Sequence, residues 1–480
     1  MRHHNQKHPG ILSFLFMTEM WERYGFYVVQ GLLVLYMTQY FGFSDEASYG
    51  ILGAFTALAY ISPILGGIIA DKLLGFRHCI LLGGLFLITG YALLALPSTQ
   101  LFLYPGLATI VVGTGLFKPN ISNLLGTQYE EHDPRLDSAF TIFYIGINTG
   151  AFLAGISSGY IRDYFGWRMS FGLASVGLII GMLTFLYGLR YLKHPHKAAP
   201  VKRIEHRGAL ALYTVLTIIG LSLLLKLQKL TSILLPVFGI GLVAYMFFLA
   251  FQQKDQARSR MLVLNTLIIS SVVYWMMYFQ MFFSMNLFVD RLVNKEVFGI
   301  PLSTTVFYAS ESVFIMIFGP LFAIAWTALS RRRCNPSPYT KFTYSLLIAG
   351  LGMLVATMGT YFPDGNMLIH PTYIFAAYFL LTVAELMLSP IGLSAVTTLA
   401  PKHLSGLMMG IWFVAIGFGG IFAGFIAKLA AIPNTVTLNA DKIAIYQGAF
   451  LNFACMAFLM GIALIFLRQF GFKKIIQDSL

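Results

Sequence analysis

The chain has 480 residues, of which 58% are hydrophobic and only 11% are charged. A soluble globular protein carries roughly a quarter of its residues as charge, so this composition excludes that class and predicts an all-α polytopic membrane protein. The net charge of +13 would fit a protein that binds nucleic acid, but the Lys and Arg residues gather in short connections between apolar runs. That placement is typical of cytoplasmic loops. We therefore expect contact with the lipid bilayer and none with nucleic acid.

The basic residues occupy alternate connections. They are collected around residues 72–77, 193–207, 254–260, 331–333 and 473–474. Other connections, at 42–48, 97–100 and 362–369, contain neither Lys nor Arg. This asymmetry predicts an integral protein of the plasma membrane, in a bacterium the inner membrane, with both termini in the cytoplasm.

Apolar runs of about 20 residues, long enough to span a bilayer as a helix, recur along the whole chain. The predicted spans are 14–40, 47–70, 78–97, 100–126, 138–161, 168–192, 208–227, 231–252, 262–290, 303–329, 340–361, 371–399, 404–430 and 444–468. We interpret them as a six-helix bundle at 1–192, a cytoplasmic linker with two additional helices at 193–260, and a second six-helix bundle at 261–480. Two similar sets are typical of a transporter built from related halves. The middle pair has almost no ionisable residue inside its apolar runs, so we expect it at the periphery.

The first span contains three ionisable residues, Glu19, Glu22 and Arg23. Their spacing of i, i+3 and i+4 places them on one face of a helix. Charge inside a membrane is costly and marks an ion or substrate pathway by default. The alternative is a static buried salt bridge that locks helix packing. Tyr27 and Gln30 continue the same polar face.

Lys118 lies in the fourth span, followed by Pro119 and Asn120. A lysine at this depth either extends to the membrane interface or pairs with a carboxylate. The sharper hypothesis is that it pairs with Glu19 or Glu22.

Two further carboxylates lie in the second half. Glu385 is far from any loop, so it could exchange a proton or anchor a substrate ammonium group. Glu311 follows only a turn or two of its helix, so it could also reach water. A set of amides, hydroxyls and aromatic rings completes the candidate binding residues: Tyr27, Gln30, Tyr60, Asn148, Trp275, Gln280, Ser389 and Trp412. Each alone is more often a packing residue, but together they could line one cavity.

The sequence contains no pattern for enzyme chemistry. There is no Gly-rich phosphate loop, no His-Glu-x-x-His helix and no nucleophile with a nearby His. The three cysteines are scattered, so we expect neither a disulfide framework nor a metal site. We expect no cofactor. These observations predict a secondary transporter driven by an ion gradient rather than an enzyme.

Several motifs, distributed over nearly the whole chain, carry a family resemblance. They are Glu19-x-x-Glu22-Arg23, Asp71-Lys72-x-x-Gly75-x-Arg77, Gly113-x-Gly115-x-x-Lys118-Pro119 with Gln128, Phe143-Tyr144-x-x-Ile147-Asn148-x-Gly150, Glu385-x-x-x-Ser389-Pro390-x-Gly392 and Gly410-x-Trp412. Through these motifs the chain resembles the proton-coupled oligopeptide transporters (POT/PTR) of the major facilitator superfamily. The two extra helices between the halves resemble the bacterial members.

The resemblance implies symport of di- and tripeptides with protons by alternating access. Glu19, Glu22 and Arg23 would couple protonation to gating, with Lys118 as their charge partner. Glu385 and Asn148 would hold the peptide amino terminus. The remaining candidates would shape the side-chain pockets: Tyr27, Tyr60, Trp275, Gln280, Ser389 and Trp412. We expect the working unit to be a monomer.

Four positions depart from the family pattern. Phe26 stands where the family has Tyr, and Gln30 where it has an Arg that helps to bind the peptide carboxylate. Phe279 stands where the family has Glu, and Glu311 stands where the family has Asn. The missing Arg and Glu are normally partners, so losing both leaves no stranded charge.

The departures suggest a second hypothesis, in which the same fold carries a cationic or carboxylate-poor solute such as a drug-like amine or a polyamine. A third reading, in a different class, is a membrane receptor that binds but does not transport. Substrate competition separates the first two readings, and substrate-dependent proton movement rejects the third.

Overall fold

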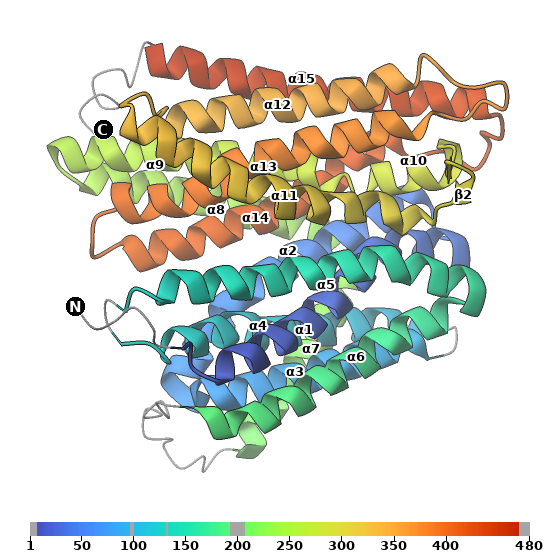
Figure 1. The fold of residues 1–480 in the computed structure, drawn as a ribbon. Coiled ribbons are helices and arrows are strands. Elements are labelled where there is room, and N and C mark those ends of the chain that lie inside the picture. The colour runs from blue at the N-terminus through green and yellow to red at the C-terminus, as the bar shows by residue number, and fades with distance from the viewer. Residues whose placement is uncertain (1–6, 97–99, 131–132, 193–206, 470–480) are drawn as a thin grey trace. The chain divides into compact units, whose positions relative to one another are not determined.

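The computed structural model describes residues 7–96, 100–130, 133–192 and 207–469 (Figure 1). Nearly all of this chain is helical. The long helices are α1 (Ile11–Leu35), α2 (Asp45–Ile69), α3 (Gly75–Ala95), α4 (Gln100–Gly126), α5 (Leu136–Phe165), α6 (Trp167–Gly188), α7 (Arg207–Lys226), α8 (Gln228–Gln252), α9 (Asp255–Phe279), α11 (Thr304–Arg331), α12 (Pro338–Gly359), α13 (Pro371–Leu399), α14 (Ser405–Ala427) and α15 (Asn439–Leu467). The predicted class, an all-α polytopic membrane protein, is confirmed.

Short elements extend or connect these helices. They are η1 (Tyr36–Tyr40), η2 (Ala70–Leu74), η3 (Leu189–Tyr191), α10 (Ser284–Leu292), β1 (Glu296–Val297), β2 (Ile300–Pro301) and η4 (Lys428–Ala430). The two strands form an antiparallel hairpin whose turn residues, Phe298 and Gly299, have φ values of +52° and +77°. Such a two-residue turn with positive φ matches the twist of the strands on either side.

Each long helix overlaps one predicted span, so the described residues are consistent with fourteen spans. Eleven segments, two of which contain more than one helix, meet length and apolarity criteria for crossing a membrane. Helix α1 is not among them. It carries Glu19, Glu22, Arg23 and Gln30 in its middle, all of them buried. The polar first span therefore depends on protein rather than lipid for its surroundings.

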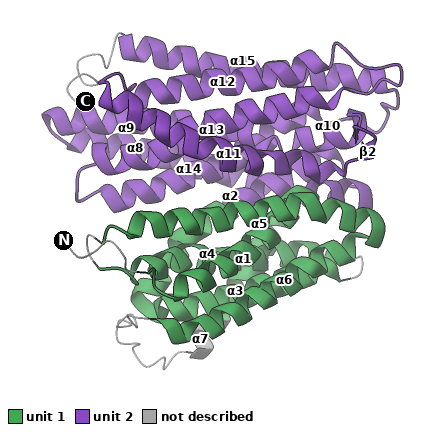
Figure 2. Ribbon diagram, in the orientation of Figure 1, with its two compact units in different colours: residues 1–32, 58–227 green, residues 33–57, 228–480 purple. Residues whose placement is uncertain are grey.

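The chain forms two compact units (Figure 2). Unit 1 comprises residues 1–32 and 58–227, and unit 2 comprises 33–57 and 228–480. The middle pair of helices is thus divided, since α7 belongs to unit 1 and α8 to unit 2. The division into 1–192, 193–260 and 261–480 stays a prediction about the two halves of the sequence.

In unit 1, glycines let other helices approach α1 closely. A Cβ atom on Gly150 of α5 would lie 2.3 Å from the Met20 carbonyl oxygen, and one on Gly177 of α6 would lie 2.5 Å from the Trp21 ring. Small residues at helix contacts permit such close approach in membranes. Helix α1 is therefore enclosed by its neighbours, which explains how it keeps its charged residues away from lipid.

In unit 2, α9 packs against α14 in the same way. A Cβ atom on Gly419 would lie 2.2 Å from the Trp275 Cβ atom. Residues 33–57 join this unit partly through an ion pair, in which Arg291 Nη1 lies 2.6 Å from Asp45 Oδ2. The Ile432 backbone N–H also donates to Asp45 Oδ2 at 2.9 Å. Asp45 thus connects the start of α2 with α10 and the segment after η4.

The middle helices α7 and α8 expose many apolar side chains. They include Leu212, Tyr213, Leu216, Ile219, Leu223, Ile233, Val237, Phe238 and Ile240. Apolar side chains exposed along whole helices are expected where lipid covers them. These exposed side chains are consistent with a peripheral position of the pair, which stays a prediction. All three cysteines are free: Cys79 is buried, and Cys334 and Cys455 are exposed.

Candidate functional site

The charge cluster of α1 consists of Glu19, Glu22 and Arg23, which are at most 3% exposed. Arg23 binds Glu22 through two contacts, of which Nη2 to Oε1 measures 2.6 Å and the other joins Nε to Oε2. Arg23 Nε also lies 3.4 Å from Glu19 Oε1. The bidentate contact between Arg23 and Glu22 is the geometry that guanidinium and carboxylate groups favour. The predicted alignment of the three residues on one face is confirmed.

The cluster holds two carboxylates and one guanidinium. Glu22 uses both of its oxygens on Arg23, whereas Glu19 Oε2 is buried and has no hydrogen-bond partner among the described residues. A buried carboxylate oxygen without a donor is costly while it is charged. Glu19 is therefore the member of the cluster that gains most from binding a proton.

Lys118 does not form the direct ion pair that we expected. Within the described residues its Nζ atom lies over the Tyr60 ring, 4.5 Å from the ring centre, and no ion pair joins it to Glu19 or Glu22. It is close enough to interact electrostatically with the cluster. The physical reason is that Arg23 already occupies the Glu22 carboxylate, and a cation over an aromatic face is stabilised without a carboxylate.

The other candidates of unit 1 lie on α1 and α5. Phe26 lies beneath the Arg23 guanidinium, 4.9 Å from it, and contacts Tyr27 edge to face. Gln30 is buried one turn further along. Asn148 donates from Nδ2 to the Tyr144 carbonyl oxygen at 3.0 Å, which is a contact within its own helix.

The second group of candidates lies in unit 2, where two carboxyl groups meet. Glu311 of α11 and Glu385 of α13 are close enough to interact electrostatically with each other. Tyr278 of α9 donates to Glu311 Oε1 at 3.5 Å. Glu311 is only 5% exposed, so the expectation that it could reach water is wrong. The eight residues of helix that begin at Thr304 are enough to bury it.

Gln280 is placed at the break between α9 and α10. Its Nε2 donates to the Ala423 carbonyl of α14 at 3.1 Å, and its Oε1 accepts from Ser284 Oγ at 2.5 Å. Both ends of the amide therefore form hydrogen bonds that stabilise the interruption between α9 and α10. A contact between Gln280 and substrate stays a prediction.

Aromatic residues surround this region of unit 2. Phe279 is buried beside Trp275 and Tyr278, so this turn of α9 carries rings and no carboxylate. Trp412 is buried against Gly392, where a Cβ atom would lie 2.0 Å from its ring. Ser389 is half-buried one turn after Glu385.

The sequence did not single out Tyr278 or the pair of Asp45 with Arg291. Tyr278 stands three residues after Trp275, so helical spacing puts both on one face and could have found it. Nothing in the sequence connects Asp45 with Arg291, which are 246 positions apart. Such pairs depend on how distant helices pack.

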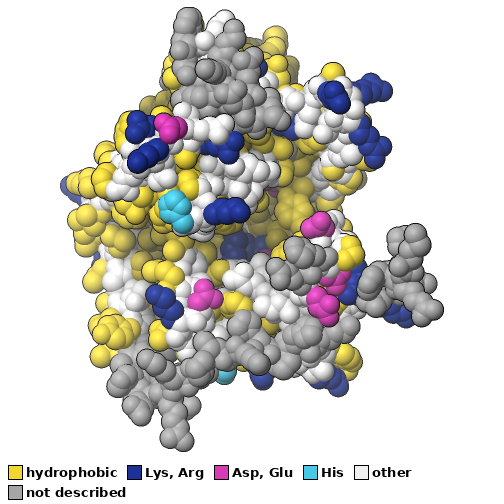
Figure 3. Space-filling model, turned by 90° about the vertical axis from the view of Figure 1, so that its left-hand side faces the viewer, with side chains coloured by type: hydrophobic (Ala, Val, Ile, Leu, Met, Phe, Trp, Pro, Cys, Tyr) yellow, Lys and Arg dark blue, Asp and Glu magenta, His cyan; other side chains and the backbone are white. Residues whose placement is uncertain are grey.

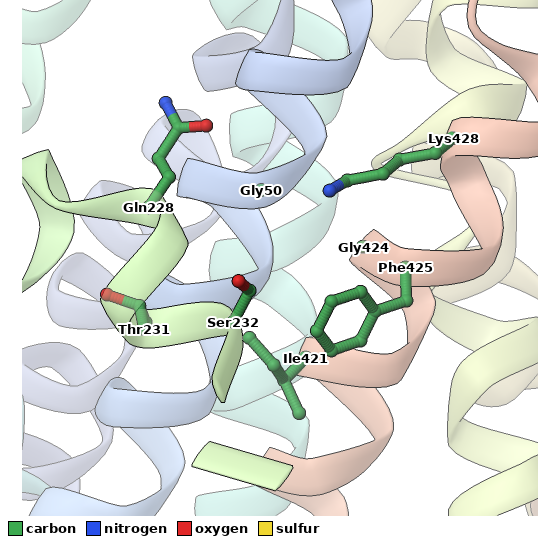
Figure 4. Close-up of a pocket in the computed structure, with 8 residues that line it drawn as sticks. All are labelled: Gly50, Gln228, Thr231, Ser232, Ile421, Gly424, Phe425 and Lys428. Carbon is green, nitrogen blue, oxygen red and sulfur yellow. The ribbon is translucent and has the colours of Figure 1, made fainter. Parts of the chain in front are cut away.

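Residues of unit 2 line two cavities. One, of about 20 Å³, lies between α2, α8 and α14, and Lys428 extends toward α2 beside it (Figure 4). It has room for roughly one water molecule and cannot hold a peptide. The other, of about 300 Å³, includes Asp45, Arg291 and Lys442 in its lining. Neither contains a residue that we predicted to bind substrate.

The fold and the buried charges define a polytopic membrane transporter, and comparison with known proteins gives the family. The model of the POT family matches residues 77–445, which is more than half of the chain. The chain therefore belongs to the POT family, as the motifs predicted. Its fold is the major facilitator fold of that family.

Curated relatives cover nearly the full length. The chain is 32% identical to the dipeptide and tripeptide permease A of Escherichia coli strain K12, over 93% of this chain and 89% of that protein. It is also 32% identical to the dipeptide and tripeptide permease B of Salmonella typhimurium strain LT2, over 92% of this chain and 91% of the relative.

Solved structures agree with these relatives. A peptide transporter, POT, in complex with sulfate matches with a TM-score of 0.84 and 29% identity, covering 96% of this chain and 95% of that one. A POT family transporter in complex with 5-aminolevulinic acid matches with a TM-score of 0.84 and 26% identity, covering 96% of both chains. Their bound molecules belong to those proteins.

Proposed function

We propose that this protein imports di- and tripeptides together with protons, as a secondary transporter that works by alternating access. The relatives named as dipeptide and tripeptide permeases support the substrate class. The observation that carries the coupling to protons is the α1 cluster, in which Glu19 keeps a buried oxygen without a donor. A proton on Glu19 relieves that cost, and the protein then uses a gradient of protons to drive peptide accumulation.

The proposed substrate contacts follow from charge. Lys118 is the cation available to a peptide carboxylate, because Arg23 is bound to Glu22. Glu385 is the acceptor available to a peptide amino terminus, since its Oε2 has no partner in the described chain, and Asn148 assists it. The remaining contacts shape the pockets: Tyr27, Gln30, Tyr60, Trp275, Gln280, Ser389 and Trp412.

We place the protein in the inner membrane of a bacterium, with both termini in the cytoplasm. Figure 3 shows Lys and Arg side chains exposed among hydrophobic ones on the side of the molecule that it presents. In the sequence the basic residues gather in alternate connections, as the positive-inside rule expects of cytoplasmic loops. The proposed working unit is a monomer. One related structure is described as tetrameric, so light scattering of the purified protein, giving a monomer or a tetramer mass, tests this point.

The contact of Asp45 with Arg291 supports alternating access. It ties the start of α2 to α10, and Asp45 lies in the connection 42–48, which lacks basic residues and is expected on the outer side. We propose that this contact closes the outer side when the binding region opens to the cytoplasm.

The test is uptake by the purified protein in proteoliposomes with an acidic exterior. The substrate panel comprises dialanine, a lysine-containing dipeptide and a simple diamine. We expect dialanine to accumulate, with competition from other neutral dipeptides and acidification of the lumen. Accumulation of the diamine alone would support the carboxylate-poor alternative. Binding of the peptides without accumulation and without counterflow exchange would reject transport.

A further inference from the structure

The cavity of about 300 Å³ in unit 2 contains none of the residues that we assign to substrate binding or proton coupling. Its volume is at the lower end of the roughly 300–1,000 Å³ that ligand pockets occupy. The polar and charged side chains in its lining are those of Thr38, Asp45, Arg291, Asn434 and Lys442. The connections 42–48 and 431–438 contribute to this lining, and neither contains Lys or Arg. In the proposed orientation the cavity therefore opens to the outer side of the membrane.

The carboxylate of Asp45 already has its full set of donors. Arg291 donates from Nη2 to Oδ1 at 2.7 Å and from Nη1 to Oδ2 at 2.6 Å, and the Ile432 backbone N–H donates to Oδ2 at 2.9 Å. The Asp45 side chain is only 4% exposed, whereas that of Arg291 is 26% exposed. A guanidinium group has five N–H donors, so the exposed part of Arg291 can reach a second acceptor in the cavity.

The charge of Lys442 is not balanced in the same way. Lys442 is half-buried in the first turn of α15, and it forms no ion pair with the residues that the structure describes. Its neighbour Asp441 is exposed and is not part of the lining. Helix α15 begins at Asn439 without a side-chain cap, and free N–H groups at a helix N-terminus favour anions. With Arg291 paired to Asp45, the lining has one positive charge in excess and suits an anion.

We propose that this cavity is an outer docking site for the carboxylate of an arriving peptide, which Lys442 binds first and for which Arg291 then exchanges Asp45. The peptide carboxylate can take the place of the Asp45 carboxylate because a guanidinium binds either in the same bidentate way. Arg291 has one carboxylate partner before and after the exchange, so no buried cation is left unpaired. The exchange also releases the contact between α2 and α10, so the arriving peptide opens the outer side. This inference rests on the proposed function, because it assigns the docked carboxylate to a transported peptide.

The experiment follows labelling of Asn434→Cys by a membrane-impermeant maleimide added to intact cells. The exposed cysteines are first replaced by alanine (C334A/C455A), and Cys79 stays because it is buried. We expect dialanine to slow the labelling, whereas dialanine amide, which lacks the carboxylate, does not. Lys442→Gln should remove the protection, and Lys442→Arg should keep it because the charge is retained. Lys229→Gln is the matched control, since Lys229 is an exposed lysine of the same unit outside the cavity lining.

Two arms separate docking from other ways of slowing the label. Protection should persist in E385Q, where binding of the peptide amino terminus is weakened, because the outer site acts before that step. Acetate should protect less than dialanine at the same concentration, since it lacks the peptide groups that Thr38 and Asn434 can contact. Equal protection by acetate would overturn the assignment to a peptide. Equal protection by dialanine and dialanine amide, or loss of protection in E385Q, would overturn the docking site.

Initial rates of dialanine uptake from the outer side provide a second readout without cysteine labelling. K442Q should raise the KM about two- to fivefold, as expected for loss of a partly exposed ion pair, with an unchanged rate at saturating dialanine. An unchanged KM together with unchanged protection in K442Q overturns the proposal. If K442Q does not fold, as absent counterflow would show, the comparison of dialanine with its amide on N434C decides alone. Failure of wild type to transport dialanine rejects the proposed function, while the labelling still reports whether the cavity binds a carboxylate.

Discussion

The two units surround their buried carboxyl groups with different kinds of side chain. In unit 1, Glu19 and Glu22 share a guanidinium that belongs to the same helix. In unit 2, Glu311 accepts from Tyr278, and no Lys or Arg among the described residues forms an ion pair with Glu311 or Glu385. A guanidinium on the same helix offsets the negative charge of the carboxyl groups in unit 1, whereas the described residues supply no such cation in unit 2. The comparison teaches that the cluster of unit 1 depends on its cation for stability, and that the carboxyl groups of unit 2 are held without one.

Removing the cation of unit 1 should have the largest effect. Arg23→Met strands two buried carboxylates, and removal of one partner from a buried ion pair costs about 3–5 kcal/mol. We expect a large drop in the melting temperature of the detergent-purified protein and no dialanine accumulation. The double variant R23M/E22M removes a charge of each sign and should recover part of the lost stability. A melting temperature of R23M equal to wild type would show that the cluster is not held by its cation.

Lys118→Ala tests whether the nearby cation matters without a direct ion pair. It should abolish proton-driven accumulation, because Lys118 interacts electrostatically with Glu19 and Glu22, but its effect on stability should be smaller than that of R23M. Uptake and melting curves of the two variants make the comparison. Lys341→Ala is a matched control in unit 2, since Lys341 also lies over an aromatic ring, and it should keep accumulation. Normal accumulation by K118A would assign Lys118 a packing role.

In unit 2, by contrast, replacing an ionisable residue should not destabilise the protein. Glu385→Gln removes one of two carboxyl groups that lack a cation, so the free energy of unfolding should stay the same or rise. Binding of a substrate ammonium group should weaken roughly ten- to hundredfold, because a hydrogen bond to a charged group contributes about 1.5–3 kcal/mol. Competition binding of dialanine measures this change. A destabilised E385Q variant with unchanged affinity would remove the distinction between the units.

The smallest effect is expected for Tyr278→Phe. The hydroxyl group lies 3.5 Å from Glu311 Oε1, which is at the limit of a hydrogen bond. We expect less than a threefold change in dialanine affinity and an unchanged proton ratio. A larger change would show that the hydroxyl holds the carboxyl pair, which the distance does not suggest.

Much of the fold follows from the sequence because apolar run length is dictated by membrane thickness. Glu19, Glu22 and Arg23 were predicted as one site because helical spacing is a local property. The partner of Lys118 was not predicted correctly, because the choice between a carboxylate and the Tyr60 ring depends on how α2 packs against α4. The meeting of Glu311 with Glu385 depends on the contact between α11 and α13. No local pattern reports such a contact, and burial of Glu311 was missed for the same reason.

The division into units shows the same limit. Hydropathy places α7 and α8 together as a middle pair, yet their contacts assign them to different units. Residues 33–57 join unit 2, where Asp45 meets Arg291. Sequence order therefore predicts which helices exist, and contacts between distant residues decide how they group.

The most direct test of the account is proton-driven uptake by Glu22→Gln. Proteoliposomes with an acidic exterior are given dialanine, and accumulation is compared with counterflow exchange in the same preparation. The account predicts that E22Q loses accumulation, because Arg23 is then free to pair with Glu19 and removes the cost that a proton on Glu19 relieves. Counterflow, which moves no net protons, should persist. Accumulation by E22Q at the wild-type level and with the wild-type proton ratio would contradict it, because the buried charge cluster of α1 would then be structural alone.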